Sequence, residues 1–218
     1  MGQKINPKGF RLGPLYTWES RWFANNQQYK FFVVEDAVIR KTLFAKLRPA
    51  GITKIEIERS INKINIILHV VRPGMVIGRG GQGMEEIKTF IQKLIAKIRK
   101  NNLTPKEKNS TKLEVRVEQV KEPYLSAYFV ASQIAEQLAK RLPHKRAVSY
   151  ALEKVMGSGA KGVKVILSGR IGGAEISRRE TYKVGSIPLS TIRERVDFEH
   201  VPSLTKSGYI GVKVWICT

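Results

Sequence analysis

The sequence predicts an α+β protein with two domains. A chain of 218 residues lies at the upper end for a single domain. Helical and strand-like patterns follow one another in the order α-β-β-α-α-β up to Lys121-Glu122-Pro123, where a proline ends a strand. A helix pair and further strands follow, a pattern typical of helices on one face of a mostly antiparallel sheet. We therefore expect an amino-terminal domain at residues 1–121 and a carboxy-terminal domain at residues 122–218.

The amino-terminal domain begins with an arm, Met1–Asn26, which is rich in Gly, Pro, Asn and Trp without a clear period. This composition predicts an extended segment with at most a short helical turn. A helix is expected from Glu35 to Arg48-Pro49-Ala50-Gly51, because proline disfavours the helical conformation in the residue before it and glycine closes the helix end. Two alternating runs, Ile52–Arg59 and Lys63–Val71, are joined by Ser60-Ile61-Asn62 and predict an antiparallel hairpin.

A glycine-rich turn separates this hairpin from the most regular helix of the chain. Apolar residues recur from Ile87 to Ile98 at positions i, i+3, i+4, i+7, i+8 and i+11. Before the glycines, Met75-Val76-Ile77 predicts a single helical turn. After the helix, a polar basic stretch leads to an alternating strand at Lys112–Val120.

The carboxy-terminal domain begins with two amphipathic helices. Apolar positions run from Ala127 to Leu138 and from Val148 to Met156, and Pro143 and Gly157-Ser158-Gly159 end the two helices. Strands are expected near Val163–Leu167 and Ile210–Ile216. The segment Arg170–Val196 is expected to hold one or two more strands.

Basic residues dominate the charge of the chain. Lys and Arg number 39 against 18 Asp and Glu, which gives a formal net charge of +21. Self-repulsion on this scale opposes compaction and is normally offset by a bound polyanion. A membrane is the weakest candidate, because no apolar run approaches the roughly 18 residues of a spanning helix. Cys217 cannot form an internal disulfide and the three histidines are scattered, so we expect a reducing compartment and no metal site.

The turn Val76-Ile77-Gly78-Arg79-Gly80-Gly81 allows two interpretations. With Gln82-Gly83 it fits G-x-G-x-x-G, but a dinucleotide-binding fingerprint follows a first parallel strand and has an acidic residue about 20 positions later. Here Pro73 and a helical turn intervene, and no carboxylate is found near Leu103 until Glu107. The second interpretation is G-x-x-G between two helices, where glycines admit a sugar-phosphate chain and helix amides and Arg79 bind phosphate oxygens. A purely structural helix-helix corner is the remaining alternative.

The turn and the element order around it resemble KH domains of type II, in which the hairpin precedes the helix pair. The KH pattern has Ile three residues after the last glycine of the turn, where this chain has Met84. The resemblance widens at Met1–Gly13, Gly159–Arg178 and Ile210–Ile216, which are similar to the ribosomal protein S-three family of bacterial type. It covers nearly the whole chain. It implies a structural constituent of the small ribosomal subunit head, which contacts small-subunit rRNA and, with neighbouring head proteins, lines the path of incoming mRNA.

The resemblance also implies which cations meet mRNA. The family's basic cluster falls on Lys145 and Arg146, with Lys140 and Arg141 nearby in sequence. One turn later the family often has another basic residue, and Ser149 stands there instead, which weakens the case for unwinding structured mRNA. The alternative is that Lys145 and Arg146 only form the solvent-exposed face of a helix.

A third basic group, Arg178, Arg179 and Lys183, follows Gly172-Gly173. Phosphate contact is one interpretation of this group, and an exposed strand edge blunted by charge is the other. The RNA-binding residues expected from the whole sequence are Arg72, Gly78, Arg79, Gly80, Gly81, Lys140, Arg141, Lys145, Arg146, Arg170, Arg178, Arg179 and Lys183.

Catalysis finds little support in the sequence. There is no P-loop, nucleophile elbow or Glu-bearing zinc motif, so we expect neither enzyme activity nor a cofactor nor a small-molecule substrate. We expect a cytoplasmic ribosomal protein, with an organellar ribosome as the alternative location. The alternative function is a free-standing KH regulator that reads single-stranded RNA, which would need neither the arm nor a basic second domain.

Overall fold

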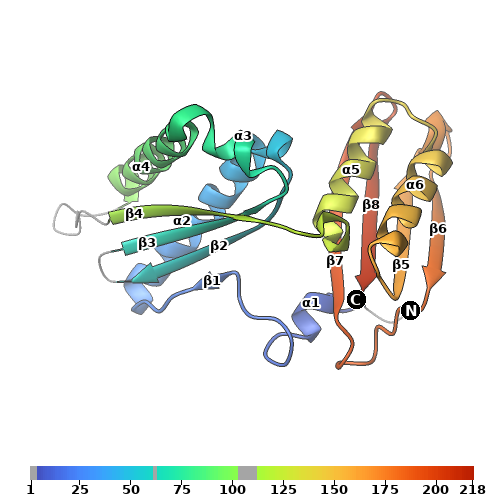
Figure 1. Ribbon diagram of the computed structural model, residues 1–218, viewed down its shortest axis with the longest axis horizontal. Coiled ribbons are helices and arrows are strands. Elements are labelled where there is room, and N and C mark those ends of the chain that lie inside the picture. The colour runs from blue at the N-terminus through green and yellow to red at the C-terminus, as the bar shows by residue number, and fades with distance from the viewer. Residues whose placement is uncertain (1–3, 61–62, 103–111) are drawn as a thin grey trace. The chain divides into compact units, whose positions relative to one another are not determined.

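The protein is described by a computed structural model that covers residues 4–60, 63–102 and 112–218. The chain forms two compact units, one of residues 18–121 and one that combines the segment up to Thr17 with Glu122–Thr218 (Figure 1). Each unit holds a four-stranded sheet with helices, which confirms the predicted α+β class. Residues 61–62 of the hairpin connection and the basic stretch 103–111, with Pro105 and Glu107, lie outside the described residues.

The unit of residues 18–121 has the predicted order α-β-β-α-α-β, preceded by a short strand. Its elements are β1 (Ser20–Arg21), α2 (Asn26–Lys46), the 3-10 turn Arg48–Ala50, β2 (Ile52–Ser60), β3 (Lys63–Val70), α3 (Pro73–Ile77), the 3-10 turn Arg79–Gly81, α4 (Gln82–Asn102) and β4 (Lys112–Gln119). The sheet order is β1-β2-β3-β4. β2 and β3 pair antiparallel, as the hairpin prediction requires, whereas β1 and β4 pair parallel to their neighbours.

One apolar core joins the three helices to this sheet. Ile39 of α2, Val76 of α3 and Ile91 of α4 are buried in the same cluster as alternate residues of β2, β3 and β4. The period-two pattern of the strands and the helical period of α4 therefore meet on one face of the sheet. This packing fixes the position of the glycine turn between α3 and α4.

Helix α2 begins at Asn26 rather than at the predicted Glu35. Its first turns, up to Val34, contain no buried residue, so hydrophobic periodicity gives no signal for them. The first buried residues of the helix are two carboxylates, Glu35 and Asp36, which are 1% and 3% exposed. The buried face of α2 therefore begins with charged residues, and an apolar stripe does not mark its start.

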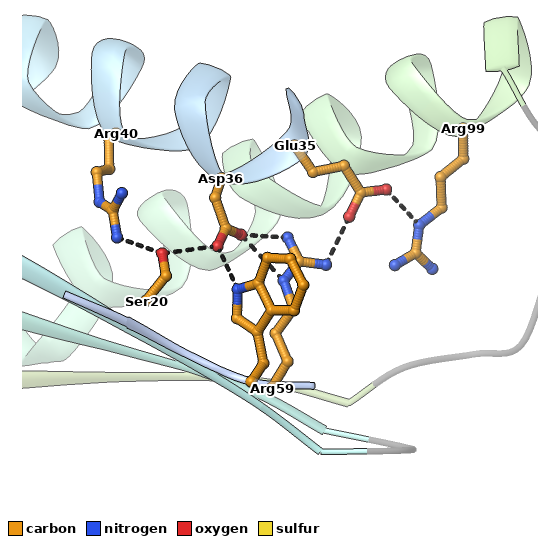
Figure 2. Close-up of polar contacts among 7 residues, drawn as sticks. Ser20, Glu35, Asp36, Arg40, Arg59 and Arg99 are labelled. Atoms are coloured by element: carbon orange, nitrogen blue, oxygen red, sulfur yellow. Dashed lines mark hydrogen bonds and ion pairs between the residues drawn. The ribbon is translucent and has the colours of Figure 1, made fainter. Parts of the chain in front are cut away.

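Two arginines and a serine from other elements donate to these carboxylates (Figure 2). Arg59 of β2 donates to Glu35 Oε2 at 2.7 Å and, through Nε, to Asp36 Oδ1 at 2.9 Å. Arg99 of α4 donates from Nε to Glu35 Oε1 at 2.8 Å. Ser20 of β1 donates to Asp36 Oδ2 at 2.9 Å and accepts from Arg40. This buried network ties β1, α2, β2 and α4 together.

The second unit places two helices on an antiparallel sheet. Its elements are α1 (Pro7–Phe10), the 3-10 turn Pro123–Leu125, α5 (Ala127–Ala139), α6 (His144–Gly157), β5 (Gly162–Gly169), the 3-10 turn Ile171–Gly173, β6 (Arg178–Gly185), β7 (Val196–Thr205) and β8 (Gly208–Cys217). The sheet order is β6-β5-β8-β7, with antiparallel pairing throughout. α5 and α6 lie side by side on the sheet (Figure 1), and their apolar residues share a core with Val163, Val165 and Val214. The predicted helix pair on an antiparallel sheet is confirmed.

The arm belongs to this second unit, which differs from the predicted division at 1–121 and 122–218. Arg11 is fully buried and donates to the carbonyl oxygens of Glu194 at 2.7 Å and Thr191 at 2.9 Å. It also donates to the carbonyls of Pro7, Pro188 and Leu189. Lys8 adds an ion pair to Asp197 of β7 at 2.9 Å. These polar contacts carry no hydrophobic period, so the sequence pattern does not reveal them.

No helix within the described part of the chain is long and apolar enough to cross a membrane.

Candidate nucleic-acid interface

The glycine turn has a backbone that side chains rarely adopt. Gly78 has φ 71° and ψ −178°, and Gly80 has φ 61°. Gly81 follows at φ 83°. Glycine is favoured at positive φ because a Cβ atom is strained there. The sequence motif therefore specifies a sharp turn from α3 into α4.

The glycines in and after this turn have two different roles, close packing of the helices and open space beside the backbone. A Cβ on Gly83 would lie 2.5 Å from the carbonyl oxygen of Val76, and one on Gly78 would lie 3.0 Å from the Gly83 nitrogen. These two glycines let the helices approach closely. A Cβ on Gly80 or Gly81 would meet no atom within 4 Å, so the space beside their backbone is open. The turn therefore has a packed side and an open side.

Two cations accompany the open side. Arg79 and Arg72, the residue before α3, are both exposed. The turn leads into the amino end of α4, where backbone amides carry partial positive charge. The strand before it, β3, is antiparallel to β2, and α3 lies between β3 and the turn. This context differs from that of a dinucleotide fingerprint, and it suits phosphate contact at the turn.

A second basic group surrounds the turn between α5 and α6. Lys140 caps the end of α5, and Arg141 has φ 61°, which is unusual for a residue other than glycine. Lys145 and Arg146 lie exposed in the first turn of α6, which contains no acidic residue. Cations at the positive end of a helix dipole oppose its stability. An arrangement that costs stability and concentrates positive potential is suited to binding phosphate.

Ser149 is exposed on the next turn of α6, on the side of Lys145. The cationic surface therefore does not continue along the helix at this position.

One carboxylate anchors the beginning of α6. His144 Nε2 lies 3.1 Å from Glu180 Oε2 of β6, and the Tyr182 hydroxyl donates to the same oxygen at 2.6 Å. The hydrogen bond from Tyr182 lowers the pKa of Glu180 against the opposing effect of burial, and the charges of His144, Arg178 and Lys145 lower it further. Burial and Glu180 together raise the pKa of Tyr182 to about 12. Glu180 thus stays ionised and holds the amino end of α6 on the sheet.

The other predicted cations do not form one cluster. Arg170 donates to the carbonyls of Ala174 at 2.8 Å and Ser207 at 3.3 Å, so part of its guanidinium supports local loops. Arg178 pairs with Glu180 at 2.8 Å. Arg179 and Lys183 occupy the alternate positions of β6, which point to the other side of the sheet. Neighbours in sequence are therefore separated by the sheet.

Sequence reasoning missed the cations that join Arg179 and Lys183 on that side. Lys164 of β5 pairs with Lys183 in register, and Lys213 of β8 pairs with Ile166. A signal was present in the short echo Gly162-Val163-Lys164-Val165 and Gly211-Val212-Lys213-Val214, in which each lysine lies between two buried valines. No group of residues suited to hold a metal ion occurs in the described ranges.

Comparisons with known proteins match both units. A family model described as KH domain matches residues 38–125, and one described as ribosomal protein S3, C-terminal domain, matches residues 134–216. The small ribosomal subunit protein uS3 of Caldicellulosiruptor bescii is 43% identical over 216 residues, which are 99% of this chain and 91% of the relative. Proteins of the same name from Clostridium novyi and Clostridioides difficile are each 43% identical, over 99% and 100% of this chain and 92% and 75% of their own lengths. The likeness therefore extends from the arm to the last strand.

Proposed function

The chain belongs to the uS3 family of small ribosomal subunit proteins, and on that basis we propose that it is a structural constituent of the small-subunit head, where it binds small-subunit rRNA and lines the path of incoming mRNA. The observation that carries this proposal is the 43% identity to proteins named small ribosomal subunit protein uS3 over 99% of the chain. Its partners are then small-subunit rRNA, mRNA and neighbouring head proteins, in a cytoplasmic or organellar ribosome.

The turn between α5 and α6, which we call the α6 turn, supports the mRNA contact. Lys140, Arg141, Lys145 and Arg146 all reach the surface, and the last two lie at the positive end of α6. Phosphate oxygens are attracted by both the side-chain charge and the helix dipole. Because Ser149 interrupts the cationic surface one turn later, we assign this turn to holding single-stranded mRNA rather than to opening stable structure.

The glycine turn at residues 78–81, which we call the KH turn, supports a second contact with RNA. The open backbone at Gly80 and Gly81 admits a sugar-phosphate chain, and Arg79 is exposed beside it. Contact of this kind fixes the position of an RNA strand without reading many bases.

Co-sedimentation tests the function as a whole. The purified chain is mixed with small ribosomal subunits lacking their own copy of the protein and is sedimented at moderate and high salt. We expect it to pellet with the subunits under both conditions, because shape and apolar contacts add to the salt-sensitive phosphate contacts. A free KH regulator would bind RNA oligonucleotides but would stay in the supernatant when the particles pellet, which would contradict the proposal.

Replacing Lys145 and Arg146 by Ala tests the α6 contact. Each phosphate contact to a single strand contributes about 0.7 to the slope of log affinity against log salt, so this slope should fall by about 1 to 2 for a single-stranded RNA. Thermal stability should be unchanged or slightly higher, since both cations oppose the dipole of α6. The control replaces Lys93 and Lys97, which lie on α4, by Ala. An equal slope for the wild type and the α6 variant would mean that these cations face only solvent.

Replacing Arg79 and Gly80 by Asp tests the KH turn. Both positions are exposed and nothing lies within 4 Å of a Cβ on Gly80, so the only folding cost is the positive φ, about 1 to 2 kcal/mol. RNA affinity should fall through repulsion of phosphate. Gly83→Ala gives the contrast: its Cβ would clash with backbone, and it should unfold the unit before any effect on RNA can be measured. Undiminished RNA affinity in the folded Asp variant would remove the turn from the interface.

A further inference from the structure

The sheet of the carboxy-terminal unit has a second face, opposite α5 and α6. The strand register places Lys164 between Lys183 of β6 and Trp215 of β8. In the next row, Ile166 lies between Thr181 and Lys213. Lys213 in turn is paired with His200 of β7. We call the open part of this side, formed by Lys164, Arg179, Thr181, Lys183, His200 and Lys213, the basic sheet face.

Charges are segregated between the two sides of this sheet. The strand carboxylates Glu180, Asp197 and Glu199 occupy the positions that alternate toward α5 and α6. On the positions of β5 to β8 that alternate to the opposite side, the described strands carry no Asp or Glu. Glu194, in the segment that covers one end of this side, is paired with Lys161 at 2.9 Å. The cations of the basic sheet face therefore lack carboxylate partners on their own strands.

The cations lie close enough to affect one another. Partial burial lowers the pKa of Lys164, and the charges of Lys4, Arg179 and Lys183 lower it further. The arm thus brings a fifth cation, Lys4, toward Lys164. Like charges gathered without counterions cost stability, and a bound anion would remove that cost.

The shape and chemistry of the basic sheet face suit a phosphate backbone. Arg179, Thr181, Lys183 and His200 are exposed, and Lys164 and Lys213 are half-buried. The Lys164 ammonium lies over the Trp215 ring, 5.6 Å from the ring centroid. Gly211 places no side chain between Ser168 and Pro202, and a Cβ there would lie 3.0 Å from Ser168 Oγ and 3.2 Å from His200 Nε2. A rigid sheet holds these donors at the strand spacings of about 4.8 Å and about 7 Å, the latter for alternate residues.

The basic sheet face offers few exposed aromatic side chains on which bases could stack. Trp215, at the centre of this side, is only 8% exposed and packs against Phe198 at a ring-centroid distance of 4.8 Å. Tyr209 is exposed, but it lies at the end of β8 beside the turn into that strand. Many proteins that bind single strands add stacking on exposed aromatic side chains to their cationic contacts, whereas double-helical RNA is bound mainly through phosphate and ribose contacts.

We propose that the basic sheet face binds the sugar-phosphate backbone of double-helical RNA, at a surface separate from the α6 turn and the KH turn. This inference rests on the proposed ribosomal function for its biological setting, and it assigns the rRNA contact of the carboxy-terminal unit to the side of the sheet opposite the helices. The unit then presents single-stranded mRNA and folded rRNA with two different surfaces.

The test replaces Arg179, Lys183 and Lys213 by Gln in the full chain. The probes are an RNA duplex of about 16 base pairs and a single-stranded oligouridine of about 12 nucleotides. The matched control replaces Lys93, Lys97 and Lys154, on α4 and α6, by Gln, so that the net charge changes equally. For the duplex, the slope of log affinity against log salt should fall by about 2 to 3 in the face variant and by less than about 1 in the control. The oligouridine slope should depend more on Lys145 and Arg146.

Folding is checked on the same samples. The face variant should melt at the same temperature as the wild type or higher, because the substitution relieves repulsion. In the wild type, added duplex should raise the pKa of the Lys164 amine, measured by NMR, since phosphates favour its charged form. An unchanged Lys164 pKa, or equal slopes for the face variant and the control, would overturn the inference.

Two further outcomes separate this inference from the proposed function. A face variant that keeps its duplex affinity but no longer joins small subunits would show that the face meets a protein, and the inference would fail while the ribosomal function stands. Loss of co-sedimentation by the wild-type chain itself would contradict the ribosomal function, whatever the duplex titration shows.

Discussion

Arg11 shows how one buried residue can organise two distant segments of the chain. Its guanidinium is fully buried, and it donates hydrogen bonds to the carbonyl oxygens of five residues rather than to a carboxylate. Arginine remains charged in proteins, so burial is tolerable only while these oxygens solvate it. The side chain therefore holds the arm and the segment Pro188–Glu194 in a single arrangement.

Arg11→Met should release both segments. The variant leaves several carbonyl oxygens without their donor, so the carboxy-terminal unit should lose about 3 kcal/mol or more of its free energy of unfolding. Hydrogen exchange should accelerate in residues 4–17 and 186–195, measured by mass spectrometry. Lys8→Met is the control: its ion pairs to Asp197 and Glu199 are partly exposed, and it should cost less than about 1 kcal/mol. Similar losses for the two variants would show that Arg11 has no special role.

At the scale of elements, the sequence predicts what hydrophobic periodicity encodes. The pattern Ile87–Ile98 predicts α4, which extends about one turn further at each end. The alternating runs predict β2, β3, β4, β5 and β8 to within about two residues of their observed bounds. Hydrophobic periodicity does not predict the start of α2, whose buried face carries Glu35 and Asp36. Nor does it predict β1, a strand of only two residues. Polar contacts between distant segments have no sequence period. For the same reason the sequence places the cations of β6 in one group, although the strand alternation places Arg178 and Arg179 on different sides of the sheet.

Arg59→Met tests the buried ionic network as a connection between elements. The Arg59 side chain is 4% exposed and contacts both carboxylates of α2. Its removal leaves Glu35 and Asp36 with fewer compensating donors, so the amino-terminal unit should lose about 3 to 5 kcal/mol, measured by denaturant unfolding. Lys63→Met removes an exposed pair with Glu114 at 2.7 Å and should cost less than about 1 kcal/mol. Adding Asp36→Asn to Arg59→Met should cost less than the sum of the single changes, because both act on one network. Strict additivity would contradict that coupling.

At the scale of the whole molecule, the surplus of positive charge connects composition to function. The buried ion pairs of α2 and the anchor of α6 use part of the 18 Asp and Glu residues internally, which leaves surface cations with fewer counterions. The KH turn, the α6 turn and the basic sheet face each present cations at the surface. A chain arranged in this way is more stable with a polyanion than alone.

The isolated chain should therefore become more stable when its charges are screened. Raising NaCl from about 0.01 M to about 0.1 M shortens the Debye length from about 30 Å to about 10 Å, which weakens repulsion between exposed cations. The buried pairs of Arg59 are screened much less, so the thermal unfolding midpoint should rise with salt, measured by circular dichroism at constant pH. The variant with Arg179, Lys183 and Lys213 replaced by Gln should show a smaller rise, since three of the repelling charges are gone. A midpoint that falls with salt would mean that exposed ion pairs outweigh the net charge of +21, and that the surplus cations do not oppose folding.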